Sequence, residues 1–170
     1  MSATLATRPD SSVQAISIRD HFDYRTVDGM IARLVLDHNV DDDTAERMLD
    51  GALVFITLCG EDPEGFYPPS QLVDHAWHLL ILCTTEYEQL CEKLAGRFIH
   101  HTPTFLESAG VEPLSIESTL SALEKYGLPI DQEVWGNGAE LARCGPSRPR
   151  PTPSGPSCGG GSSCGGGGGE

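Results

Sequence analysis

The chain has 170 residues, a formal net charge of −14 and 39% apolar residues. This length and apolar content are sufficient for one domain with its own hydrophobic core. Proteins that bind nucleic acid neutralise phosphates with a basic face, and 11 basic against 25 acidic side chains cannot readily form one. We therefore expect an acidic protein with neither a nucleic-acid partner nor a membrane partner.

The N-terminal residues lack the apolar core of a secretion signal, and no later apolar run reaches the roughly 18 residues that span a bilayer. The sequence therefore predicts a cytoplasmic protein. In a reducing compartment its six cysteines should be thiols, and three of them, Cys59, Cys83 and Cys91, fall within predicted helices.

The composition divides the chain into three parts. We expect a flexible N-terminus over 1–17, a helical domain over 18–135 and a tail over 136–170. The tail is rich in Gly, Pro, Ser and Cys, and it has too few apolar side chains to offset its ordering entropy by burial. We therefore expect it to be disordered.

Two helices are predicted in the first third of the domain. Apolar residues recur at helical spacing up to Asn39, which ends the first helix. The second begins in the acidic run 41–43, with Asp43 and Glu46 as a capping box, and ends at Gly60.

A third helix is predicted from its N-cap Ser70 through an apolar run that includes Leu82. Its apolar residues point in almost every direction, so we expect it to be the central, buried element. A fourth helix with a capping box at Thr85 and Glu88 should end at Gly96.

Ser115 and Gly127 mark the start and end of a fifth helix. No alternation of convincing length predicts a strand. The predicted fold class is all-α, a compact helical bundle of about five helices with a disordered Gly-rich C-terminal tail.

A polar constellation lies within this apolar pattern. Asp74 and His78 are four residues apart and share one helix face, so the imidazole is the natural partner of a carboxylate that is expensive to bury alone. Trp77 would cover one side of the pair. A helical hairpin would return His100 and His101 toward the Asp74 end of the third helix.

These five residues form the predicted polar centre, which two interpretations explain. One is a buried hydrogen-bonded network that fixes the helical hairpin. The other is a metal site with Asp74, His78 and His101 as ligands, because two imidazoles and one carboxylate hold iron(II) in open sites and, with water, zinc. No catalytic residue is assigned.

The segment from Pro69 to Phe105 resembles the glycine-rich domain-containing protein family, whose large N-terminal portion is a domain of unknown function. The residues that carry the resemblance are Asp74, Trp77, His78, Ile81, Leu82, Thr84, Tyr87, Cys91, Gly96, Phe98, His100 and His101. The chain is similar to a short, bacterial-type member. It departs from the W-H-x-H pattern of the plant members, since Leu80 stands at the second histidine.

The functional prediction is a cytosolic binding or interaction module with an Asp/Trp/His centre and an unidentified protein or small-molecule partner. The alternative is an iron- or zinc-dependent enzyme that uses the same residues. An open pocket beside His78 would favour the enzyme, and a closed, solvent-free network would favour the interaction module.

The tail allows a third prediction. Cys158 and Cys164 lie among Gly and Ser residues, a composition that resembles the modifiable core of thiazole- and oxazole-containing peptides. The helical domain would then be the leader of a peptide precursor. The two tail thiols could also bind a soft metal.

Overall fold

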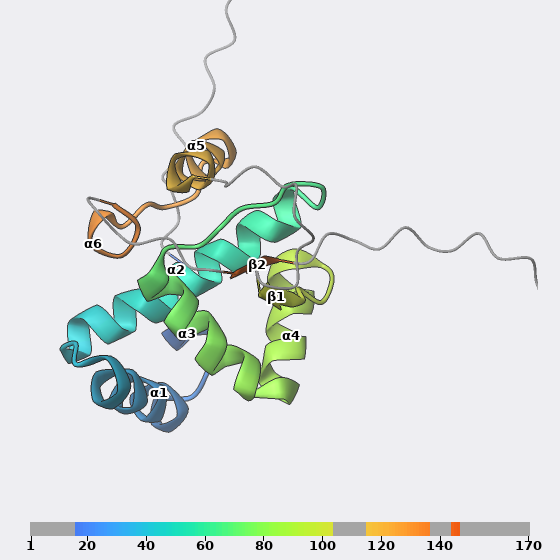
Figure 1. Cartoon of the computed structure of the whole chain (residues 1–170). Helices are drawn as coiled ribbons and strands as arrows, with labels where there is room; N and C mark the ends of the chain where they lie inside the picture. The colour runs from blue at the N-terminus through green and yellow to red at the C-terminus, as the bar shows by residue number, and fades with distance from the viewer. Residues whose placement is uncertain (1–15, 104–114, 137–143, 147–170) are drawn as a thin grey trace, which may run out of the picture.

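The computed structural model describes residues 16–103, 115–136 and 144–146 (Figure 1). This part of the chain contains six α-helices, one 3₁₀ helix and two three-residue strands, so the prediction of an all-α bundle is confirmed. The elements, in order, are η1 (Ile18–Asp20), α1 (Tyr24–His38), α2 (Asp42–Glu61), α3 (Gln71–Leu82), α4 (Thr84–Ala95), β1 (His101–Pro103), α5 (Ile116–Tyr126), α6 (Gln132–Trp135) and β2 (Cys144–Pro146).

The two strands form one antiparallel pair in which His101 lies opposite Pro146. β2 falls within the segment that the sequence assigns to the tail, and the pairing places it beside the connection that follows α4. Residues 1–15 and 147–170 lie outside the described part of the chain.

Most predicted helix ends agree with the structure. Asn39 (φ 53°), Gly96 (φ 65°) and Gly127 (φ 67°) adopt the left-handed conformation that ends α1, α4 and α5. Ser70 caps α3, where its Oγ accepts a hydrogen bond from the backbone N–H of Val73 at 3.2 Å. Local residue chemistry therefore determines these boundaries.

Both predicted capping boxes are wrong. The N-cap of α2 is Asp41, which accepts from the N–H of Thr44, and Glu46 instead binds Arg19 of η1 at 2.6 Å. The N-cap of α4 is Cys83, which makes no side-chain capping bond. Cys83 is also the C-cap of α3. The two helices therefore share one capping residue, and α4 begins immediately after α3 ends, without a capping side chain.

The central helix is α2 and not, as expected, α3. α2 contacts η1, α1, α3, α4, α5 and α6, and it lies behind α3 in Figure 1. Eleven residues of α2 are buried, against five of α3. Leu82 of α3 is 78% exposed. The apolar surface of α3 therefore faces partly outward, and part of it lines a pocket.

Close packing of α2 against α4 fixes the turn that leads to β1. A Cβ on Gly60 would lie 2.5 Å from the Cα of Ala95, so only glycine allows this approach. Just beyond, Arg97 donates from Nη2 to the carbonyl oxygen of Cys59 at 2.8 Å. The chain is thus tied to α2 before it reaches His101.

α5 and α6 cover the N-terminal end of α3 through hydrogen bonds of buried side chains. Thr119 donates to the carbonyl of Pro68 at 2.8 Å, and Ser70 donates to the carbonyl of Val134. α6 has only four residues, too short for an apolar period to predict it, and it places Trp135 in the core.

Within the described residues, no helix combines the length and apolar character needed to cross a membrane. Cys59, Cys83 and Cys91 are free thiols, as predicted.

Candidate metal centre

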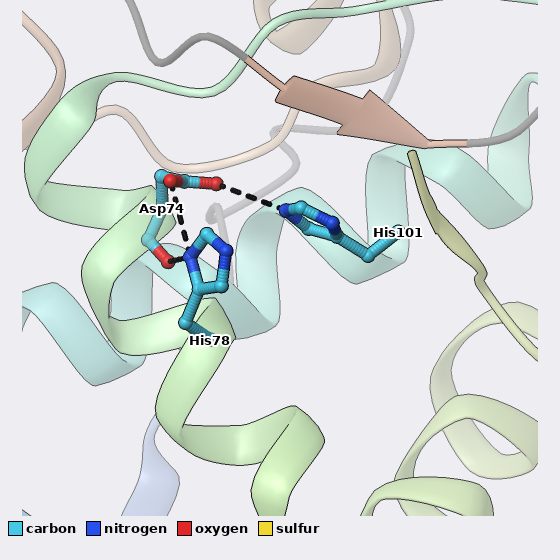
Figure 2. A group of neighbouring side chains, drawn as sticks. All are labelled: Asp74, His78 and His101. Carbon is cyan, nitrogen blue, oxygen red and sulfur yellow. Dashed lines mark hydrogen bonds and ion pairs between the residues drawn. The ribbon is translucent and has the colours of Figure 1, made fainter. Parts of the chain in front are cut away.

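Asp74 is the centre of the polar constellation. It lies in the first turn of α3 and is only 7% exposed. Figure 2 shows dashed lines from the two oxygens of its carboxylate to the imidazole rings of His78 and His101. A buried carboxylate requires partners. The structure supplies two imidazoles from different elements.

His78 follows one helical turn after Asp74, as the spacing predicts. Its Nδ1 lies 3.1 Å from Oδ2 of Asp74 and 2.8 Å from the backbone oxygen of the same residue. The side chain is 51% exposed. The tautomer with a proton on Nδ1 donates to the carbonyl oxygen and leaves the lone pair on Nε2, which is how metal-ligating histidines are commonly oriented.

His101 reaches the same carboxylate from β1. Its Nε2 lies 3.7 Å from Oδ1 of Asp74, which is too long for a hydrogen bond. This nitrogen is buried and has no hydrogen-bond partner within the described residues. The two imidazole rings lie 4.4 Å apart at their centroids. A buried, unsatisfied nitrogen that points at a carboxylate indicates a site suited to a third group.

The spacing fits a metal ion. Ligand atoms of Asp74, His78 and His101 lie within 4.8 Å of one another. In a tetrahedral zinc site with bonds of about 2.0–2.2 Å, neighbouring ligand atoms are roughly 3.3–3.5 Å apart. The 3.7 Å between Nε2 of His101 and Oδ1 of Asp74 is close to that value. Small side-chain rotations would complete a three-ligand set and leave at least one coordination position for water or another ligand.

The electrostatics differ between the two histidines. The hydrogen bond to Asp74 raises the pKa of His78, in spite of partial burial. Burial lowers the pKa of His101, and the neighbouring His78 adds to this effect. His101 is therefore neutral near pH 7, with a lone pair available for a metal. At His78 a metal has to compete with a proton that Asp74 stabilises.

Trp77 and Tyr87 hold His101 in position. Trp77 is fully buried, and its ring packs on that of His101 with centroids 4.8 Å apart. Its Nε1 donates to the hydroxyl of Tyr87 at 2.9 Å, and that hydroxyl donates to the carbonyl of Ile99 at 2.6 Å. This chain of bonds links α3 and α4 to the residue two positions before His101.

The structure brings together four of the five residues of the predicted polar centre. His100 is the exception, because it is exposed and its ring packs on Phe98. The positioning role of Tyr87 was not predicted, although a tyrosine on the buried face of α4 is a signal that could have suggested it. Cys158 and Cys164 lie outside the described residues, as does the segment on which the precursor interpretation rests.

A pocket of ≈ 520 Å³ lies beside the site, between α1 and α3. Its lining comprises residues of both helices, namely Arg33, Leu34, Asp37 and His38 of α1 with His75, His78, Leu79 and Leu82 of α3. His78 thus belongs both to the candidate metal centre and to the pocket. Sequence reasoning did not find this pocket, because it depends on how the two helices pack.

Fold and site together define a helical domain with a candidate two-histidine, one-carboxylate metal centre. The chain matches the model of the UCP032817-like family over residues 16–112, more than half of its length. The chain belongs to this family, which is uncharacterised. The matched segment contains Asp74, His78 and His101, whereas α5 and α6 follow it. No curated protein and no solved structure matches the chain.

Proposed function

We propose that this chain is a metal-binding module in which Asp74, His78 and His101 hold one divalent ion, zinc or iron(II). The observation that carries the proposal is the buried Nε2 of His101, which lacks a hydrogen-bond partner in the described part of the chain and points at the carboxylate of Asp74. Leaving such an atom unsatisfied costs about 1–3 kcal/mol, and a metal–nitrogen bond would remove that cost.

The surroundings of the ligands support a binding site over a closed structural network. Half of the His78 side chain is exposed, and His78 lines a pocket of ≈ 520 Å³. A solvent-free network that only fixes the hairpin would not need this opening. A metal held by three protein ligands with an open position could bind a small molecule directly, polarise a carbonyl oxygen or activate a water molecule.

The test is metal analysis of protein purified without an affinity metal column. We expect about one zinc or iron ion per chain after anaerobic reconstitution, and none in His78→Ala and His101→Ala. The matched control is His100→Ala, since His100 neighbours His101 but is exposed and lies outside the ligand set. Substitution with cobalt(II) adds a second measurement, because its visible spectrum reports nitrogen and oxygen ligation.

Absence of metal from the reconstituted wild type would overturn the proposal. Metal binding that survives in His101→Ala, or that is lost to the same extent in His100→Ala, would do the same. If His78→Ala instead unfolds the domain and no preparation binds metal, Asp74 and His78 form a structural pair, because loss of one partner leaves a buried carboxylate uncompensated.

A further inference from the structure

The pocket between α1 and α3 has the size and lining of a small-molecule site. Its ≈ 520 Å³ falls within the roughly 300–1,000 Å³ that such sites occupy. Leu34 is 2% exposed, and Leu79 is partly buried. Leu82, the last residue of α3, is 78% exposed although it lines the same pocket. These three side chains line the apolar part of the pocket, and the accessible apolar surface that a ligand would cover belongs mainly to Leu79 and Leu82.

One cation lies in the lining of this pocket. Arg33 donates from Nε to Asp37 at 2.6 Å, and its side chain is 60% exposed. A guanidinium has five N–H donors, so its terminal nitrogens can also bind a carboxylate. Asp37 is the one acidic residue among those described around the pocket, and Arg33 neutralises it. The terminal nitrogens of Arg33 are therefore the groups that would pair with an anion in this pocket, although the whole chain is acidic.

The remaining wall consists of imidazoles. His38 and His75 stack with ring centroids 3.8 Å apart and an interplanar angle of 9°, so the two rings are nearly parallel. His78 continues this wall toward Asp74. A divalent ion bound to Asp74 would carry a net positive charge, so it would also attract an anionic ligand near His78.

We infer that this pocket binds a small carboxylic acid with an apolar body, whose carboxylate pairs with Arg33 while its chain covers Leu34, Leu79 and Leu82. The inference rests on the proposed function, because it names the class of ligand presented to the metal centre through His78. Affinity for the acid should rise when the metal is bound, and by linkage the acid should raise affinity for the metal by the same factor.

The probes are octanoate and its neutral analogue octanol, titrated into the full chain in metal-free and zinc-loaded forms. Calorimetry measures affinity, and backbone amide shifts locate the binding site. Leu82→Ser should weaken octanoate about tenfold, and Leu36→Ser, a 77% exposed leucine of α1 outside the pocket, is its control. Arg33→Gln should weaken octanoate about tenfold and leave octanol unchanged, with exposed Arg25→Gln as its control.

Saturable octanoate binding with these variant effects, and tighter binding to the zinc-loaded form, supports the inference. It is overturned if octanoate does not saturate, if pocket variants behave as their controls, or if octanol binds as tightly. The zinc content of each sample is measured separately. Zinc binding without octanoate binding removes only the pocket assignment, whereas octanoate binding without zinc removes the metal centre and leaves the pocket.

Discussion

Two neighbouring places at the N-terminal end of α3, the N-cap Ser70 and the carboxylate of Asp74, treat buried polar groups differently. At the N-cap, Ser70 is fully buried, accepts from Val73 N–H and donates to the Val134 carbonyl, and Thr119 is bonded to Pro68 nearby. One helical turn after Ser70, the carboxylate of Asp74 faces a buried nitrogen of His101 that makes no hydrogen bond. Buried side chains whose hydrogen bonds are all made, such as Ser70 and Thr119, indicate a structural role. A buried nitrogen without a hydrogen bond, as in His101, indicates a place for a ligand.

The largest expected effect is the gain in stability on zinc binding, which should depend on Asp74 and not on Ser70. Zinc at about 100 times its dissociation constant should stabilise the wild type by about 2.7 kcal/mol. Asp74→Asn should abolish this increment, because it removes the anionic ligand. Ser70→Ala should keep it, although the protein starts from a lower stability. Thermal unfolding with zinc and with a chelator measures both increments, and an equal zinc response in wild type and Asp74→Asn would contradict the distinction.

Ser70→Ala should lower the free energy of unfolding by about 2 kcal/mol. The substitution removes the cap of α3 and leaves the carbonyl of Val134 without this donor. Urea denaturation measures the loss. Ser118→Ala is the control, since its hydroxyl bonds locally to Ser115 near the surface, and this change should cost under about 0.5 kcal/mol.

Tyr87→Phe tests whether the positioning of His101 matters to the site. The change leaves the Nε1–H of Trp77 and the carbonyl of Ile99 without their shared partner, at a cost of about 1–2 kcal/mol. Zinc affinity should also fall about tenfold, as it does when groups that orient a ligand are removed. A stability loss without any change in zinc affinity would show that Tyr87 supports only the fold.

The pH dependence of zinc affinity tests whether His78 is a metal ligand. The hydrogen bond to Asp74 raises the pKa of His78, so the imidazole binds a proton more tightly than a free histidine does. Zinc binding should therefore release protons, and its apparent affinity should fall as the pH falls through this raised pKa. Calorimetry in buffers of different ionisation enthalpy counts the protons. Zinc affinity that does not change between pH 8 and pH 6 would contradict His78 as a ligand.

The smallest expected effect is a change in stability with pH that comes from Asp50, a carboxyl that already has a hydrogen-bond partner. Burial raises its pKa to about 6, although it accepts from the N–H of Ile18 at 2.7 Å. The folded state therefore binds the proton more tightly than the unfolded state, and stability should fall as the pH rises from about 4 to 6.

This contribution should be about 1 kcal/mol, since Asp50 is only partly buried and solvent screens it. Asp50→Asn keeps an acceptor oxygen and should flatten the pH dependence in that window. Asp42→Asn, an exposed carboxyl in the same helix, should retain it. Urea denaturation at several pH values distinguishes the two variants.

Local chemistry in the sequence determined the helical class, most helix ends and the pairing of Asp74 with His78. Ser70, Asn39, Gly96 and Gly127 act on their own backbone, and the i,i+4 spacing acts within one helix. Such effects depend on neighbours in the chain, so they can be inferred without knowledge of the tertiary fold.

Only the tertiary structure decided which helix is central, which of two adjacent histidines reaches Asp74, and where the pocket lies. α3 is apolar in most directions, but the packing of six elements around α2 leaves Leu82 exposed. His101 faces inward and His100 outward because the bonds of Tyr87 and Arg97 fix the turn between α4 and β1. These contacts join residues far apart in sequence, and no local pattern encodes them.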